Sequence, residues 1–214
     1  MNTQIKESPR LFSNADLRKL ILPLVLEQTL VITVGMVDTM MVSSVGEAAV
    51  SGVSLVDMLV NLVLSVFAAL STGGAVVTSQ FLGAKREKDA CHSSRQLIYT
   101  VAIFSSAVMV VCMLACRPIL SFFFGSIEAD VMEIARIYLL ICAVSFPCMG
   151  VYDAAAALFR AMGNSLIVLK ASCIMNAVNI VGNAIGIYVL KMGVAGVAVP
   201  TLLSRIVAAA ILFI

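Results

Sequence analysis

The sequence predicts an all-α, polytopic membrane protein, and three observations support this fold class. Apolar residues make up 61% of the 214 residues, and the mean hydropathy is +1.07, whereas soluble domains are about 45–50% apolar. Only 12% of the residues are charged. The apolar residues form long runs, and a helix that crosses a hydrocarbon core of about 30 Å needs roughly 20 of them. A soluble core could not bury this much apolar surface.

Six segments are long enough, or nearly so, to be transmembrane helices. We expect a polar N-terminal segment at 1–16 and a transmembrane lobe over 17–214, truncated in its sixth helix because the chain is still apolar at Ile214. Pro118 and Gly125 indicate a loop between the third and fourth helices. The expected helices are 17–42, 54–81, 96–116, 132–158, 165–190 and 194–214.

The lysine and arginine residues predict the orientation of the helices. If every segment spans, ten of these residues lie on one side, and Arg117, Arg136 and Lys191 lie on the other. Cytoplasmic loops carry the excess of Lys and Arg, so we expect a multi-pass protein of the inner (cytoplasmic) membrane with segment 1–16 in the cytoplasm. The ten are Lys6, Arg10, Arg18, Lys19, Lys85, Arg86, Lys88, Arg95, Arg160 and Lys170.

Several classes of function have no support in the sequence. No GxxxxGK[ST], HExxH or GxSxG motif is present, so we expect no enzyme and no cofactor beyond a coupling ion. No basic patch with interleaved aromatic residues is present, so nucleic acid is not an expected partner. The six cysteines form no CxxC pair, and no metal site is predicted.

Two carboxylates in the first helix are the first candidates for function. Glu27 and Asp38 are 11 residues apart, which corresponds to about 20° around a helix and about 16 Å along it. They therefore share a face, and a carboxylate within a bilayer usually faces a cavity or a partner. Glu27 is a cavity candidate, or a protonated side chain bonded to a neighbour. Asp57, near the expected start of the second helix, is interpreted as an interfacial charge without a special role.

The fifth helix carries a polar stripe of Ser172, Asn176, Asn179 and Asn183. At 100° per residue these side chains lie within about 60° of one another. Unpaired amides in lipid are costly, so the stripe must face protein or water. Its amides either bind neighbouring helices or offer oxygen ligands to a cation, since hard cations prefer oxygen.

The remaining candidates lie in the fourth and sixth helices. Pro200 releases a backbone carbonyl and Thr201 supplies a hydroxyl, as in many transporter ion sites, although an ordinary proline kink explains the pair equally well. Arg205 needs either a counter-charge or cytoplasmic water. Asp153 is either a charge in a cavity or a buried acid. We regard Asn176, Asp153 and Arg205, with Glu27, as candidates for the cavity.

Five short segments together resemble the N-terminal lobe of multidrug and toxin extrusion (MATE) transporters, of the MATE and polysaccharide flippase superfamily. They occur in the family's order and span most of the chain. The segments are LPLVLEQ at 22–28, VDT at 37–39 with GEAA at 46–49, QFLGAKREK at 80–88, FRAMGN at 159–164 and GVAGVAVPT at 193–201.

The resemblance implies a six-helix lobe of a two-lobe transporter that lacks its C-terminal lobe. It implies antiport in which Na⁺ or H⁺ enters while a cationic or amphipathic drug or toxin leaves. It also implies a cation site of Asp38, Asn179, Asn183 and Thr201, although Asn183 stands where many members carry Asp. A lipid-linked oligosaccharide flippase of the same superfamily, or a membrane fragment without transport, remains the alternative.

Overall fold

The computed structural model describes residues 14–125 and 127–213. Most of these residues are helical and none of them forms a strand, so the all-α prediction is confirmed. Residues 1–13, most of the segment predicted to be cytoplasmic, lie outside these ranges. The elements are α1 (Asn14–Ser43), α2 (Glu47–Gly83), α3 (Glu87–Leu114), α4 (Cys116–Phe124), α5 (Ala129–Val144), α6 (Phe146–Ala161), α7 (Ser165–Ala184), the π-helix η1 (Ile185–Val189) and α8 (Ala195–Phe213).

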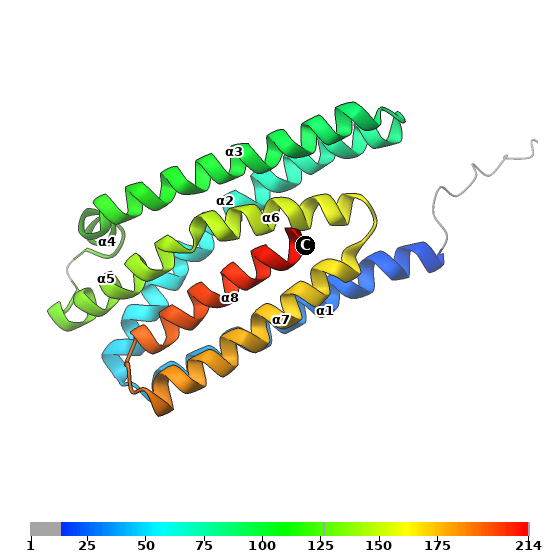
Figure 1. Ribbon diagram of the computed structural model, residues 1–214. Coiled ribbons are helices and arrows are strands. Elements are labelled where there is room, and N and C mark those ends of the chain that lie inside the picture. Colours follow the sequence, from blue (N-terminus) through cyan, green and yellow to red (C-terminus); the bar gives the residue numbers. More distant parts are fainter. Residues whose placement is uncertain (1–13, 126, 214) are drawn as a thin grey trace, which may run out of the picture.

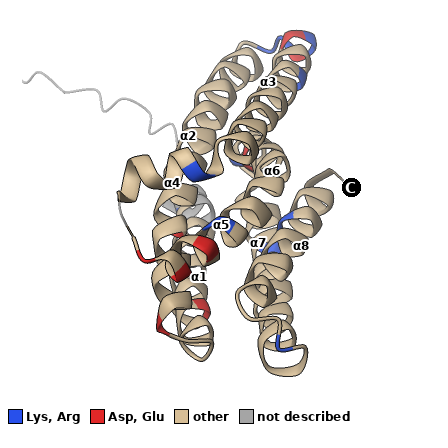
Figure 2. Ribbon diagram, turned by 90° about the vertical axis from the view of Figure 1, so that its left-hand side faces the viewer, with Lys and Arg blue, Asp and Glu red and all other residues tan. Residues whose placement is uncertain are grey.

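The length and composition of the helices agree with a membrane protein of about six spans. Within the described residues, five helices are long and apolar enough to cross a membrane, and the bent pair α5–α6 makes a sixth span if it crosses as one. In Figure 2 charged residues gather at the turn between α2 and α3, while long stretches of helix carry no charge. Large apolar side chains such as Ile103 and Leu114 are exposed on the outside, as lipid contact requires.

The fourth predicted helix is not continuous, which corrects the prediction of one helix over 132–158. It breaks at Ser145 into α5 and α6, whose axes differ by 48°. Pro147 lies at the start of α6 and explains the break. Proline has no N–H to donate, and its ring clashes with the carbonyl four residues earlier, here that of Ala143.

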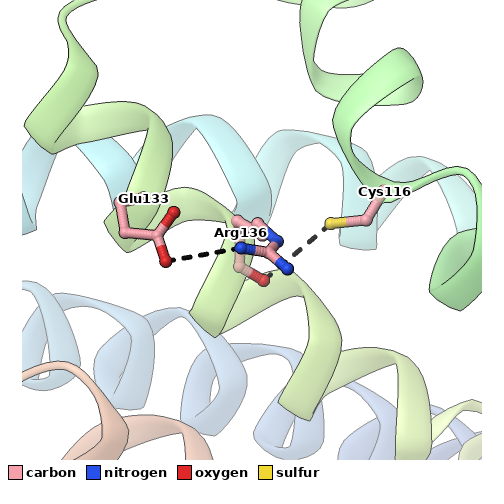
Figure 3. Close-up of polar contacts among 3 residues, drawn as sticks. All are labelled: Cys116, Glu133 and Arg136. Carbon is pink, nitrogen blue, oxygen red and sulfur yellow. Dashed lines mark hydrogen bonds and ion pairs between the residues drawn. The ribbon is translucent and has the colours of Figure 1, made fainter.

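The predicted loop between the third and fourth helices is wrong, because residues 116–124 form α4. Pro118 is tolerated there because it lies in the first turn of the helix, where its missing N–H has no helical partner. Gly125, with φ of 64°, ends the helix. α4 packs against α5, where the thiol of Cys116 donates to the backbone oxygen of Arg136 at 3.9 Å (Figure 3).

The second and third helices also begin earlier than predicted, at Glu47 instead of Ser54 and at Glu87 instead of Gln96. Acidic residues in the first turn of each helix interact favourably with the helix dipole, and this stabilises the longer helices. The extension of α2 moves Asp57 from the edge of the helix to its eleventh residue. At 1.5 Å per residue this is about 15 Å from the start.

The helices run alongside one another, and α8 lies between α6 and α7 (Figure 1). α1 runs beside α7, and α2 packs on α3, α5 and α6. The α7–α8 contact is very close, because η1 brings Gly186 against the backbone of Gly196 with no room for a side chain at either position. Phe67 of α2 is fully buried and makes edge-to-face contacts with Phe104 and Phe146. These contacts fix the helices that surround the candidate site.

Candidate functional site

A cavity of about 510 Å³ lies among α1, α2, α5, α6, α7 and α8. Its wall is unusually polar for a protein of this composition. All the sequence-predicted site residues except Asn183 line it. The polar and charged side chains of the wall are Glu27, Gln28, Asp38, Thr39, Ser54, Asp57, Asn61, Tyr138, Tyr152, Asp153, Arg160, Ser172, Asn176, Asn179, Thr201, Ser204 and Arg205.

At one end of the cavity Asp38 of α1 meets the polar stripe of α7. Asn183 is fully buried behind the wall, and its Nδ2 donates to Asp38 Oδ1 at 2.8 Å. The same nitrogen lies 3.3 Å from Oδ1 of Asn179, one helical turn earlier. The i, i+4 spacing places both amides on the face of α7 that α1 covers. The structure therefore brings together the carboxylate and the two amides that the sequence singled out.

Thr201 of α8 completes this group. Its Oγ1 lies 3.0 Å from the side-chain amide of Asn179 and donates to the carbonyl of Val197 at 2.8 Å. Pro200, inside α8, cannot donate to the carbonyl of Gly196. Asp38, Asn179, Asn183 and Thr201 thus lie in contact across three helices.

The amide of Asn179 can adopt two orientations, which present either a hydrogen-bond donor or an acceptor to Asp38. One of its terminal atoms lies 3.1 Å from each carboxylate oxygen of Asp38, and the other lies 3.0 Å from Thr201 Oγ1. If the nitrogen faces Asp38, two amide donors from α7 serve an ionised carboxylate. If the oxygen faces Asp38, three oxygens converge, and a proton or a cation is needed between them. Hydrogen bonding, and not the positions of the heavy atoms alone, decides which orientation is present.

At the other end of the cavity Glu27 of α1 forms an ion pair with Arg160 of α6. Arg160 Nη2 lies 2.7 Å from Glu27 Oε1, and the Glu27 side chain is almost completely buried. Glu27 therefore faces the cavity, as expected of a cavity candidate, and it has a basic partner there. Arg160, predicted only as a positive charge near a loop, is the partner that sequence reasoning missed.

A second pair of contacts involves residues of the bent span. Tyr138 of α5 donates its hydroxyl to Asp57 Oδ1 at 3.1 Å, and both residues line the cavity. The interpretation of Asp57 as an interfacial charge was therefore wrong. Arg205 of α8 donates to the hydroxyl of Ser145 at 2.6 Å, at the break between α5 and α6. Arg205 lines the cavity, and its polar protein partner Ser145 is fully buried behind the wall.

The remaining candidates also face the cavity. Asn176 is buried and donates to Ser172 Oγ at 3.4 Å within α7. Asp153 of α6 lines the wall and makes no ion pair within the described residues. The lining therefore holds four carboxylates (Glu27, Asp38, Asp57, Asp153) and two guanidinium groups (Arg160, Arg205). The excess of carboxylates favours a positively charged occupant.

The fold of the chain is that of solved MATE transporters. A structure of MATE in complex with MaL6 matches with a TM-score of 0.87 at 20% identity, over 92% of this chain and 43% of that one. A MOP superfamily transporter from Pyrococcus furiosus matches with a TM-score of 0.86 at 19% identity, with the same coverage. At these identities the likeness shows the fold alone.

Two relatives with similar sequences are longer than this chain. A probable multidrug resistance protein NorM of Thermotoga maritima is 29% identical over 92% of this chain and 43% of its own length. An uncharacterised transporter, YisQ, of Bacillus subtilis is 27% identical over 86% of this chain and 41% of its own length. The chain spans about two fifths of the length of these relatives. Residues 23–185, most of the sequence, match the family described as MatE, and the chain therefore belongs to the MatE family.

Proposed function

We propose that the chain is the N-terminal lobe of an antiporter that exports cationic or amphipathic compounds across the cytoplasmic membrane. The observation that carries the proposal is the contact of Asp38 with Asn183, Asn179 and Thr201 at the end of a cavity with more acidic than basic side chains. Relatives described as probable multidrug resistance proteins NorM, from Thermotoga maritima and Bacillus licheniformis, support the export of drugs.

Coupling follows from the charge on Asp38. When the carboxylate is ionised, Asn183 Nδ2 and the Asn179 amide nitrogen can both donate to it. When a cation or a proton binds, the Asn179 amide turns so that its oxygen faces the site. Thr201 Oγ1 serves either orientation because a hydroxyl both donates and accepts. The two states differ in the direction of the hydrogen bonds across the α1–α7–α8 contact and in the charge at Asp38, and this difference can drive a rearrangement of the lobe.

The exchange of coupling ion for substrate also depends on the negative charge of the cavity and of Asp38. A cationic substrate in the cavity neutralises the acidic wall, and a bound coupling ion neutralises Asp38, so each disfavours the other electrostatically. Na⁺ suits a site of one carboxylate and neutral amide and hydroxyl oxygens, and H⁺ suits the carboxylate alone. The acidic lining supports this function better than the flipping of an anionic lipid-linked oligosaccharide, for which more basic lining is expected.

The orientation of the lobe belongs to the same proposal. Lys85, Arg86 and Lys88 lie at the turn between α2 and α3, the end of the lobe that also holds the α6–α7 turn. The excess of Lys and Arg supports a cytoplasmic location for this end. The Glu27–Arg160 end of the cavity is then the cytoplasmic end, and Asp38 lies towards the outside.

Drug accumulation in cells tests the proposal. Cells that express the complete protein are expected to accumulate severalfold less ethidium, a cationic dye, than cells that express Asp38→Asn at the same level in the membrane. Asp89→Asn, an exposed carboxylate in an ion pair with Arg86, is the matched control and should export like the wild type. Equal accumulation with the wild type and Asp38→Asn would remove Asp38 from the mechanism.

A further inference from the structure

Three of the four carboxylates in the cavity wall are already engaged by other side chains. Glu27 is in its ion pair with Arg160 at 2.7 Å. Asp38 accepts a hydrogen bond from an amide of α7 at 2.8 Å. Asp153 forms no ion pair within the described residues, but the positive charges of both Arg160 and Arg205 act on it. A cation that enters the cavity therefore meets carboxylates that the protein already hydrogen-bonds or partly balances, with one exception.

Asp57 of α2 is the exception. Its Oδ1 accepts a hydrogen bond from the hydroxyl of Tyr138 at 3.1 Å, whereas its Oδ2 has no partner among residues 14–125 and 127–213. Asp57 is only partly buried and lines the cavity, and Oδ2 is not one of the enclosed side-chain atoms that lack a partner. This oxygen is therefore in contact with the cavity and open to an occupant.

The surroundings of Asp57 orient the carboxylate without cancelling its charge. Tyr138 is 5% exposed, and its hydroxyl is a neutral donor. Arg205 is the guanidinium whose charge acts on Asp57, but it donates to Ser145 at 2.6 Å and forms no ion pair in the part of the chain that the structure describes. A carboxylate at the depth of a bilayer needs a partner, and a positively charged occupant of the cavity would supply it.

We propose that Asp57 binds the positive charge of the exported compound, with Tyr138 holding the carboxylate in position. Asp38, which the proposed function assigns to the coupling ion, is a different carboxylate. The charges of Asp57 and Asp38 interact across the cavity, so a cation on one weakens the attraction of the other for a second cation. Substrate and coupling ion then disfavour each other without sharing a ligand. This inference rests on the proposed function, because it names the residue that recognises the substrate in the same cavity.

Two probes that differ only in charge test the role of Asp57. Both are dansyl amides with linkers of equal length, one ending in a trimethylammonium group and the other in an uncharged tert-butyl group of the same shape. Dansyl fluorescence would measure their dissociation constants for the complete protein in lipid nanodiscs, with empty nanodiscs subtracted. The wild type is expected to bind the cationic probe about tenfold more tightly than the neutral one. We call this ratio the charge discrimination.

Four variants separate a specific role of Asp57 from the general acidity of the cavity. Asp57→Asn should reduce the charge discrimination to about twofold or less. Tyr138→Phe keeps the charge of Asp57 but removes the donor that orients it, and should lower the discrimination by about two- to threefold. Asp153→Asn makes the same substitution in the same cavity and should lower it by much less than Asp57→Asn, because two guanidinium groups already act on Asp153. Asp89→Asn, in the ion pair at the α2–α3 turn, should have no effect.

Binding of the neutral probe reports whether the cavity of each variant is intact, and it should stay within about twofold of the wild type. If Asp57→Asn weakens both probes equally, its role is structural and the proposal is wrong. If Asp57→Asn keeps the wild-type discrimination, or if Asp153→Asn loses as much, Asp57 is not the recognition residue, although the proposed function stands.

Two further outcomes concern the division between the two carboxylates. Asp38→Asn should keep at least about half of the charge discrimination, because Asp57 remains. If Asp38→Asn abolishes it and Asp57→Asn does not, Asp38 serves both the ion and the substrate, and the proposal is wrong. If the wild type binds neither probe, or shows no preference for the cation, the export of cationic compounds fails as the proposed function, and the role of Asp57 fails with it.

Discussion

Asn183 of α7 donates to Asp38 of α1 at 2.8 Å, and this contact joins residues 145 positions apart in the chain. Asn183 is completely buried, and its Oδ1 has no partner in the described residues. The amide therefore acts as a donor from behind the cavity wall, to Asp38 and, at the longer distance of 3.3 Å, towards Asn179 Oδ1. This hydrogen bond joins α1 and α7 at the carboxylate of Asp38, the group whose charge is expected to change.

Asn183→Asp tests whether the residue beside Asp38 determines which ion drives export. The substitution places a second carboxylate against Asp38, and two ionised carboxylates at this distance repel each other strongly, so the pair is expected to hold a proton. We expect the ratio of export driven by a proton gradient to export driven by a sodium gradient to rise by about threefold or more. Asn176→Asp makes the same change on the same face of α7, away from Asp38, and should leave the ratio unchanged. The same ratio in wild type and Asn183→Asp would contradict a direct role for position 183.

The Glu27–Arg160 pair predicts an asymmetry between two substitutions. The side chain of Glu27 is 8% exposed and that of Arg160 is 34% exposed. Arg160→Met leaves a buried carboxylate without its partner, whereas Glu27→Gln leaves a guanidinium that water can reach. We expect Arg160→Met to destabilise the protein by about 2 kcal/mol, less than for a fully buried pair because Arg160 is partly exposed, and Glu27→Gln to cost less. Thermal unfolding in detergent would compare them, and a larger loss for Glu27→Gln would contradict the asymmetry.

The Gly186–Gly196 contact predicts a strong effect of one methyl group. A Cβ at Gly186 would overlap the backbone of Gly196, whereas a Cβ at Gly73 of α2 would meet nothing within 4 Å. Backbone atoms on both sides cannot move independently, so Gly186→Ala should destabilise the α7–α8 pair by about 3 kcal/mol. Gly73→Ala should be neutral or slightly stabilising, because alanine is the better helix former. Equal melting temperatures for the two variants would show that the close contact is not required.

Two native cysteines are predicted to react differently with maleimides. Cys91 of α3 is exposed, while Cys116 of α4 is buried. Burial raises the pKa of the Cys116 thiol above its ordinary value, an effect larger than the opposing one of Arg136 and Arg117. The reactive species is the thiolate, so Cys116 should react slowly at pH 7 and accelerate only as the pH rises past the ordinary thiol range. Comparable rates at pH 7 would contradict the burial of Cys116.

The exposed cysteine also tests the orientation of the lobe. In a protein that keeps Cys91 and lacks the other cysteines, a membrane-impermeant maleimide should label Cys91 only after the cells are permeabilised. Glu128→Cys, at an exposed position near the other end of the lobe, should be labelled in intact cells on the same background. The reverse pattern would place the α2–α3 turn outside the cell.

The sequence predicts most of the spans, and the shared face of Asn179 and Asn183, because both depend on local periodicity. Apolar runs define the helices, and the spacing of Asn179 and Asn183 places both amides on one face of α7 before any tertiary contact is known. Asp38 belongs to the same group because a carboxylate in a bilayer needs a partner.

Other parts of the site depend on relationships that local patterns do not contain. The Glu27–Arg160 pair joins residues 133 positions apart, and Tyr138 and Tyr152 look like ordinary apolar-face aromatics until their hydroxyls are placed. Asp57 was misplaced because the start of its helix was set seven residues too late. The break at Ser145 was missed because a proline in a transmembrane helix does not always interrupt it.

The most direct test of the coupling role of Asp38 is efflux from proteoliposomes that contain the complete protein, loaded with ethidium. Sodium and proton gradients are imposed separately, in rigorously sodium-free buffer for the proton gradient. We expect the wild type to respond to at least one gradient with an efflux rate at least tenfold above that of Asp38→Asn, while both proteins insert equally and bind dye. Gradient-driven efflux by Asp38→Asn at the rate of the wild type would contradict the assignment of Asp38 as the residue that couples ion entry to export.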